Sequence, residues 1–159
     1  MTGLLDGKTA LIVGVANKRS IAWAIAEQLA AAGARCAFTF QNERVEGDVR
    51  KLAATLPNPG PVLPLDVQDE AQLDAAVDGA AEGLGGLDIL VHAVAFARAD
   101  DLTGRFVDTD KEGFALSLDI SASLSCAEAR ASCALATACC AASRALSSRV
   151  LVVVISSLS

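Results

Sequence analysis

Short apolar runs, each bounded by polar residues, glycine or proline, recur along this chain. Their length and their continuous apolar character are typical of strands buried on both faces of a parallel sheet. The pattern predicts strands at Lys8–Val13, Arg35–Phe40, Val62–Leu65, Leu87–Ala93 and Val150–Ile155.

Between these runs the apolar residues take helical spacing. Helices are predicted at Ser20–Ala32, Glu43–Leu56 and Asp69–Ala81, and a fourth begins over Thr109–Leu118. Ser20 is a candidate N-cap of the first helix and Gly33 its stop. The run 57–61 contains three prolines and stops the second helix.

Strands that alternate with helices imply parallel pairing through right-handed crossovers. The sequence therefore predicts an α/β fold, a Rossmann-like doubly wound sheet in three layers, with residues 1–159 as a single domain. Ligands of such sheets bind beyond the carboxyl ends of the strands. That rule selects residues 14–21, Gln41, residues 66–67 and residues 92–97.

The segment 121–149 is almost entirely Ala, Ser, Cys and Leu, so its packing is weakly specified. Cys126, Cys133 and Cys140 are seven residues apart and would share one helix face. Without a nearby His or a C-x-x-C pair, small-residue packing is favoured over a metal site, and no metal is predicted.

Composition narrows the function classes. The 159 residues carry a formal net charge of −6, which disfavours binding to nucleic acid or to an anionic membrane. No apolar run is long enough for a membrane helix, and no signal peptide is recognisable. Five cysteines, an odd number, favour reduced thiols and a cytoplasmic location.

The loop between the first strand and the first helix is the strongest functional signal. Gly14 permits a tight turn after the strand, and Ser20 offers its hydroxyl and its N–H to a phosphate. Ile21 opens the helix, whose N-terminal dipole favours an anion. A plain strand–helix connection with a capping serine is the alternative. The strand–loop–helix context favours a dinucleotide.

Two further strand ends fit the same ligand. Gln41 stands where dinucleotide enzymes often carry an acidic residue for the adenosine ribose. The carboxylate of Asp66 and the N–H of Val67 are suited to adenine. The alternatives are an exposed strand end for Gln41 and a helix cap for Asp66, although Asp69 is better placed to cap. His92, the sole histidine, is interpreted as structural.

The sequence resembles the bacterial enoyl-acyl-carrier-protein reductases, which are divergent short-chain dehydrogenases/reductases. Five segments carry the resemblance: GVANKRSIA at 14–22, FTFQNER at 38–44, LDV at 65–67, LDILVHAVAFA at 87–97 and EGF-x4-DIS at 112–121. The resemblance covers about residues 4–121.

The resemblance implies an NADH-dependent oxidoreductase of fatty-acid elongation, with NADPH less favoured. It would reduce the 2,3 double bond of a trans-2-enoyl chain on its partner, acyl carrier protein, and would assemble as a homotetramer. Positions matching the family's cofactor contacts are Gly14, Ser20, Ile21, Gln41, Asp66, Val67 and Val94. Ala97 matches a position that lines the acyl pocket.

The chain departs from the family at its C-terminal end. The family's catalytic Tyr-x6-Lys pair would lie beyond Ser159, and Ser157 stands at the place of another family tyrosine. No catalytic residue is therefore assigned, and the C-terminal part of the domain is expected to be missing. The alternatives are a non-catalytic NAD-binding fragment or pseudoenzyme, and a different short-chain reductase.

Overall fold

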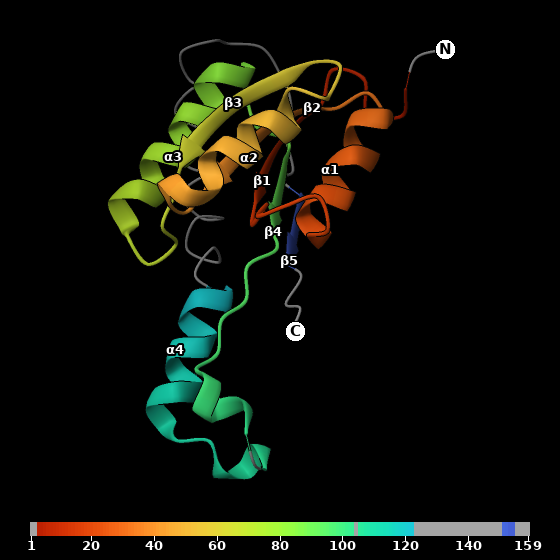
Figure 1. The fold of residues 1–159 in the computed structure, drawn as a ribbon. Helices are drawn as coiled ribbons and strands as arrows, with labels where there is room; N and C mark the ends of the chain where they lie inside the picture. The colour runs from red at the N-terminus through yellow and green to blue at the C-terminus, as the bar shows by residue number, and fades with distance from the viewer. Residues whose placement is uncertain (1–2, 104, 123–150, 155–159) are drawn as a thin grey trace.

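A computed structural model describes residues 3–103, 105–122 and 151–154 of the chain. Strands and helices alternate along it (Figure 1). They are β1 (Thr9–Val13), α1 (Ile21–Ala31), β2 (Arg35–Phe40), α2 (Glu43–Ala53), β3 (Pro59–Pro64), α3 (Glu70–Leu84), β4 (Ile89–His92), α4 (Lys111–Ala122) and β5 (Leu151–Val154), with 3₁₀ turns η1 (Ala99–Leu102) and η2 (Phe106–Asp108) after β4. Most of the predicted segment 121–149 lies outside the described residues.

The predicted α/β fold is confirmed. All five strands are parallel, in the order β3-β2-β1-β4-β5. The sheet grows outward from β1 in both directions, so the chain changes direction between β3 and β4. This reversal creates the switch point beyond β1 and β4, where ligands of such sheets bind.

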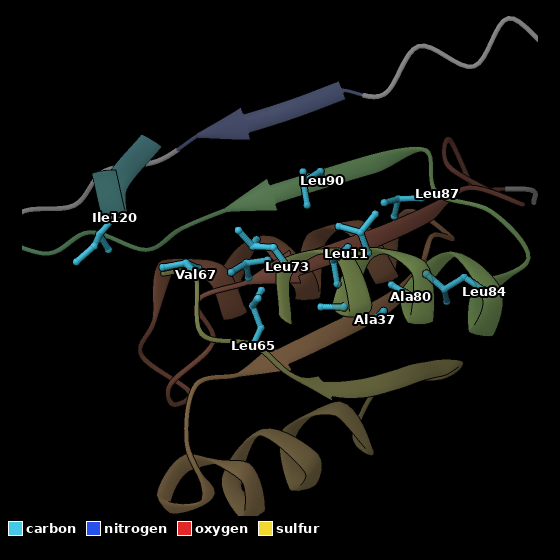
Figure 2. Close-up of a cluster of buried hydrophobic side chains, with 13 residues drawn as sticks. Leu11, Ala37, Leu65, Val67, Leu73, Ala80, Leu84, Leu87, Leu90 and Ile120 are labelled. Atoms are coloured by element: carbon cyan, nitrogen blue, oxygen red, sulfur yellow. The ribbon is translucent and has the colours of Figure 1, made fainter. Parts of the chain in front are cut away.

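Alternation along the strands divides the core into two layers, one on each face of the sheet. Leu11, Val13 and Leu90 pack with the apolar side of α3 (Figure 2). Their neighbours Ala10 and Ile12 pack with α1 and α2 on the opposite face. Because successive strand residues point to opposite faces, both sides of β1 must be apolar, and all five of its residues are buried.

The α1/α2 layer contains the bulkiest buried side chains. Trp23 of α1 lies with its ring centroid 6.0 Å from that of Phe38 in β2. Cys36 is buried in the same layer, and burial raises the pKa of its thiol to about 11. This thiol is therefore protonated at neutral pH.

Most element boundaries differ from the sequence prediction by one to three residues, and the start of β3 is the most informative case. β3 begins at Pro59, so Pro59, Gly60 and Pro61 belong to the strand and do not merely end α2. β3 lies at the sheet edge, and its pairing with β2 shifts register between Cys36 and Phe38. Edge strands and bulges tolerate proline because a missing N–H costs no internal ladder bond there.

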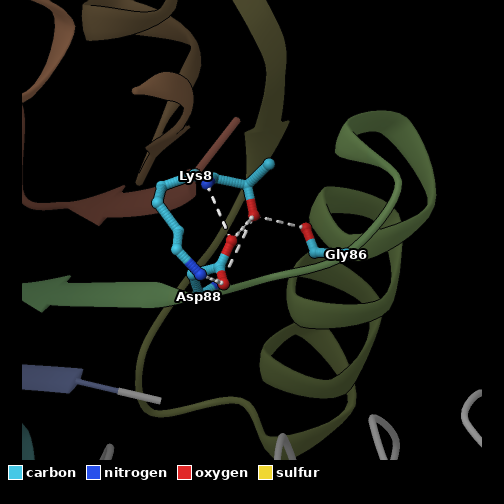
Figure 3. A network of polar contacts seen from close by, with 4 residues as sticks. Lys8, Gly86 and Asp88 are labelled. Carbon is cyan, nitrogen blue, oxygen red and sulfur yellow. Dashed lines mark hydrogen bonds and ion pairs between the residues drawn. The ribbon is translucent and has the colours of Figure 1, made fainter. Parts of the chain in front are cut away.

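A polar network joins the starts of β1 and β4 at the opposite end of the sheet from the switch point (Figure 3). The carboxylate of Asp88 accepts from Lys8 Nζ at 2.8 Å and from Thr9 N at 3.0 Å. The hydroxyl of Thr9 donates to the carbonyl of Gly86 at 2.9 Å. Burial alone would raise the pKa of Asp88, but the bonds from Lys8 and Thr9 outweigh it and hold this pKa below its ordinary value.

Asp88→Asn should lower the free energy of unfolding by about 1–2 kcal/mol at pH 7, because the network loses its charge-assisted bonds. The folded pKa is depressed, so the carboxylate contributes fully above its unfolded pKa of about 3.9, and this contribution disappears as the pH falls through the lower folded value. Urea unfolding at pH 7 and pH 2.5 measures both effects. Asp48→Asn, at an exposed pair with Lys51, is the control and should be nearly neutral. Equal losses for the two variants at pH 7 would contradict the prediction.

Candidate functional site

A cleft of about 720 Å³ opens at the carboxyl ends of β1, β2 and β4. It is lined by the loop after β1, the ends of β2 and β3 with the residues that follow them, the segment after β4, and one side of α4. All seven residues predicted to contact a cofactor lie on its wall: Gly14, Ser20, Ile21, Gln41, Asp66, Val67 and Val94. Residues up to 80 positions apart in the sequence thus meet at one site.

Two separate constraints require glycine at position 14. Its φ of +104° lies in the region that side chains rarely adopt. A Cβ on Gly14 would also lie 2.7 Å from the carbonyl carbon of Ala93 and 3.2 Å from Val94 Cγ2. The loop after β1 therefore passes directly over the segment after β4, and this leaves an open cradle beside the N-terminus of α1.

Ser20 is the N-cap residue of α1, as predicted, but its side chain does not cap the helix. Its hydroxyl donates instead to the carbonyl of Asn17 at 2.7 Å, and Asn17 Oδ1 accepts from Arg19 N at 2.8 Å. These bonds close the loop on itself. The first turn of α1 carries no acidic residue, so no carboxylate there offsets the positive end of the helix dipole.

Gln41 is exposed at the end of β2. The next residue, Asn42, caps α2 by accepting from Arg44 N at 3.1 Å. Gln41 lines the cleft, and its side chain takes no part in the cap of α2. Arg19 is the only basic residue among those that line the cleft, and Asp66 is the only acidic one.

Asp66 is not the cap of α3. That cap is Asp69, whose Oδ1 accepts from Ala71 N at 2.9 Å and from Gln72 N at 3.2 Å. Bonds from the backbone and side chain of Gln72 lower the pKa of Asp69. Asp66 Oδ1 accepts from Gln68 N at 3.1 Å, which orients the carboxylate at the end of β3. Of the two interpretations of Asp66, the helix cap is wrong.

The strip after β4 forms another wall of the cleft through Ala93, Val94, Ala95 and Phe96. Phe96 is an exposed aromatic side chain there. Ala97, predicted to line an acyl pocket, is half-buried and is not on the cleft wall. Its assignment to acyl binding stays a prediction.

His92 is completely buried, in agreement with its structural interpretation. Its Nε2 lies 3.3 Å from the carbonyl oxygen of Ile120 in α4. Burial lowers the pKa of His92, although hydrogen bonding to Ile120 and Ser121 opposes the shift. The ring is therefore neutral at pH 7 and can donate from Nε2 to that carbonyl.

Sequence reasoning missed the contribution of α4. Leu116 and Ile120, one helical turn apart, both line the cleft, and Ile120 also reaches the core near Val67 (Figure 2). The spacing of these two residues indicates a shared apolar face of the helix. The sequence does not reveal which part of the protein that face contacts. Among the described residues, no cluster of His, Cys, Asp or Glu is suited to a metal, and no helix is long and apolar enough to cross a membrane.

Comparison with known proteins identifies the family. The family model described as enoyl-(acyl carrier protein) reductase matches residues 14–156. The chain belongs to the enoyl-(acyl carrier protein) reductase family. The match includes the loop after β1 and every predicted cofactor position in the cleft.

Individual members of the enoyl-(acyl carrier protein) reductase family support the assignment. The chain is 47% identical over 128 residues to enoyl-[acyl-carrier-protein] reductase [NADH] FabI of Bacillus cereus, covering 80% of this chain and 50% of that protein. A crystal structure of the Bacillus cereus enzyme with NADP⁺ and an indole naphthyridinone has a TM-score of 0.76 at 45% identity, covering 84% of this chain and 52% of that one. The [NADPH] FabI of Staphylococcus aureus is 40% identical, covering 74% of this chain and 46% of that protein.

The chain spans about half the length of these curated reductases. Their names differ in the nicotinamide cofactor, NADH for one and NADPH for the other. The family thus includes members named for either form of the nicotinamide cofactor.

Gly14→Ala should destabilise the chain by about 2–4 kcal/mol, because it combines a strained φ with a clash against the Ala93 carbonyl. Thermal or urea unfolding measures this loss. Gly85→Ala separates the two causes, since Gly85 has a φ of +82° but open space around it, and should cost about 1 kcal/mol. Gly47→Ala, in the exposed middle of α2 with open space around it, should stabilise by about 0.5–1 kcal/mol. A cost at Gly14 no larger than at Gly85 would show that the close approach is unimportant.

Proposed function

We propose that the cleft binds NADH and that the chain supplies the cofactor-binding part of an enoyl-acyl-carrier-protein reductase of fatty-acid elongation. One observation carries the proposal: seven positions that match the family's cofactor contacts converge on one 720 Å³ cleft at the switch point of a parallel sheet. When bound, NADH would supply the hydride that reduces the 2,3 double bond of a trans-2-enoyl thioester.

The pyrophosphate is assigned to the cradle between Gly14 and the N-terminus of α1. The missing side chain at Gly14 leaves room for a ligand to approach the backbone, and a Cβ would fill that room. Backbone N–H groups of the first turn and the positive end of the helix dipole favour an anion there. Arg19 adds the one positive side chain on the cleft wall.

The adenosine half is assigned to the ends of β2 and β3. The amide of Gln41 can bond a ribose hydroxyl, and as a neutral group it does not repel a 2′-phosphate as strongly as a carboxylate would. Asp66 can accept from the adenine amino group with the carboxylate that Gln68 N orients. NADH is favoured over NADPH by the resemblance as a whole, and the Bacillus cereus relative at 47% identity is named for NADH.

The nicotinamide half is then left to the strip at Val94. The small side chains of Ala93 and Ala95 leave a flat wall for a planar ring, and Phe96 gives this end of the cleft an apolar surface. Ala97 is assigned to the acyl chain, just beyond the cleft wall. No residue of the described part of the chain is given a catalytic role; these residues bind and orient.

Three further assignments complete the proposal. The partner is acyl carrier protein bearing an enoyl chain, the assembly is a homotetramer, and the location is the cytoplasm. Family membership supports the first two assignments, and the odd number of cysteines supports the last.

A second candidate is a dinucleotide-binding unit without turnover. It is favoured by the absence of tyrosine from the sequence, because the resemblance assigns enolate stabilisation to a tyrosine. An assay of NADH oxidation with a crotonyl thioester separates the candidates. Little or no turnover is expected of these 159 residues. Saturable NADH binding without oxidation would therefore support the second candidate, and robust turnover would contradict it.

NADH should bind saturably, and Asp66→Asn should weaken binding about tenfold, because a charge-assisted bond to adenine is lost. Asparagine keeps the acceptor for Gln68 N, so the local turn should persist. Titration followed by nicotinamide fluorescence measures both affinities. Asp78→Asn, on the exposed side of α3, removes the same charge away from the cleft and should bind as the unmodified chain does. Absence of saturable binding in the unmodified chain would overturn the proposed function.

Gln41→Asp should shift the NADH:NADPH affinity ratio toward NADH by about tenfold, because a carboxylate accepts from the ribose hydroxyls and repels a 2′-phosphate. Parallel titrations with the two cofactors measure the ratio. Gln41→Asn is the matched control, since it keeps a neutral amide, and should leave the ratio within about twofold. An unchanged ratio in Gln41→Asp would place the ribose elsewhere.

A further inference from the structure

Arg98, which follows the cleft wall by two residues, is bonded to two carboxylates from different segments. Its Nε donates to Asp101 Oδ2 at 3.1 Å, and its Nη2 donates to Asp110 Oδ1 at 3.0 Å. Asp101 belongs to η1, whereas Asp110 immediately precedes α4. We call these three side chains the Arg98 clip. The clip closes the stretch from the end of β4 to the start of α4 into a loop.

Asp110, the last residue of the Arg98 clip in the sequence, also caps the beginning of α4. Asp110 Oδ1 accepts from Gly113 N at 2.6 Å, and the carbonyl of Asp110 accepts from Phe114 N at 3.0 Å. These bonds occupy N–H groups that the first turn of a helix otherwise leaves without partners. Gly113 N lowers the pKa of Asp110, and the charge of Arg98 acts in the same direction.

The clip is closely packed on its inner side. The side chain of Asp101 is only 10% exposed, and a Cβ on Gly113 would lie 2.6 Å from Asp101 Cγ. Gly113 therefore lets the Asp101 carboxylate sit against the first turn of α4. This burial distinguishes Asp101 from the aspartates of ordinary surface ion pairs, which gain little because water competes for them.

Both chain segments joined by the Arg98 clip also contribute residues to the cleft wall. On one side, Ala95 and Phe96 of the cleft wall immediately precede Ala97 and Arg98. On the other side, Leu116 and Ile120 of α4 form another part of the wall, and Ile120 O meets His92. The clip and the His92 contact thus hold α4 at two places relative to β4 and the strip that follows it.

We propose that Arg98 is a positioning residue: through Asp101 and Asp110 it fixes the strip 93–96 relative to α4, and so sets the affinity of the cleft for the dinucleotide. The inference rests on the proposed function for its ligand. Its structural part, that Arg98 holds the strip and α4 together, stands on the contacts alone.

The neighbouring pair of Arg105 and Asp108 supplies a matched control. It also joins an arginine to an aspartate three residues later, at 3.3 Å, but both side chains are highly exposed and neither lines the cleft. Asp88→Asn is the second control, because it weakens the opposite end of the sheet without touching the cleft.

The test is NADH titration of the full 159-residue chain. Arg98→Ala should weaken NADH binding about fivefold, and Arg98→Lys should recover part of the loss because one ion pair can reform. Asp110→Asn keeps an acceptor for Gly113 N and loses the ion pair with Arg98. If Arg98 and Asp110 act through their ion pair, the double variant Arg98→Ala/Asp110→Asn should bind NADH no more weakly than the single variant Arg98→Ala.

Arg105→Ala should leave NADH affinity unchanged, and Asp88→Asn should lower thermal stability without changing NADH affinity. Unchanged affinity in Arg98→Ala, or an equal loss in Asp88→Asn, would overturn the positioning role.

Hydrogen exchange without cofactor separates this inference from the proposed function. Arg98→Ala should speed amide exchange in residues 93–97 and 113–120 while leaving residues 9–13 unchanged. If the unmodified chain binds no NADH, the proposed function fails, and this exchange pattern alone still supports the structural part. Unchanged exchange in both segments would overturn it.

Discussion

The close approach of two backbones at the switch point sets the geometry of the whole site. β1 and β4 are neighbours in the sheet, and the loop that leaves β1 must cross the segment that leaves β4. It crosses at Gly14, where no side chain separates it from Ala93. Any larger residue would push the loop outward and move the N-terminus of α1 away from the sheet. The N-terminus of α1 and the strip after β4 therefore owe their positions to the same close approach.

Packing on the two faces of the sheet fixes the position of β1, and therefore the place where the loop after β1 crosses the segment after β4. The α1/α2 layer holds large rings, whereas the α3 layer holds mostly Leu, Val and Ala. β1 is fixed between them with every side chain buried. At the opposite end, Asp88 ties β1 to β4 through Lys8 and Thr9. The two strands are thus held at both ends, by a charge network at one and by backbone contact at the other.

Local pattern was sufficient for most of the fold. Continuous apolar runs predicted the strands, and the β2 boundaries agree exactly, because a strand buried on both faces leaves an unambiguous signature. β3 was predicted too short because proline normally argues against a strand, and only its edge position makes the prolines acceptable. The rule that ligands bind beyond the carboxyl ends of parallel strands selected segments that contribute to the cleft, and the family resemblance predicted seven cofactor contacts within them.

The rest of the site could not be predicted from local sequence patterns, because it depends on how distant segments pack together. Leu116 and Ile120 are ordinary apolar residues of a helix, and only the path after β4 brings them to the cleft. The hydroxyl of Ser20 bonds Asn17 instead of the helix, because the loop folds back on itself. Asp66 and Asp69 had competing roles in the sequence, and the geometry of the α3 cap decided between them.

The prolines of β3 make the two edges of the sheet chemically different. A proline nitrogen has no hydrogen, so a strand carrying Pro59, Pro61 and Pro64 is a poor template for a further strand on its outer side. β5, at the other edge of the sheet formed by the described strands, contains only Leu and Val and so has no proline. Among the described strands, β5 is therefore a more favourable neighbour than β3 for an additional strand. Pro59 and Pro61, which the sequence first presents as a helix stop, thus make one edge of the sheet unfavourable for a further strand.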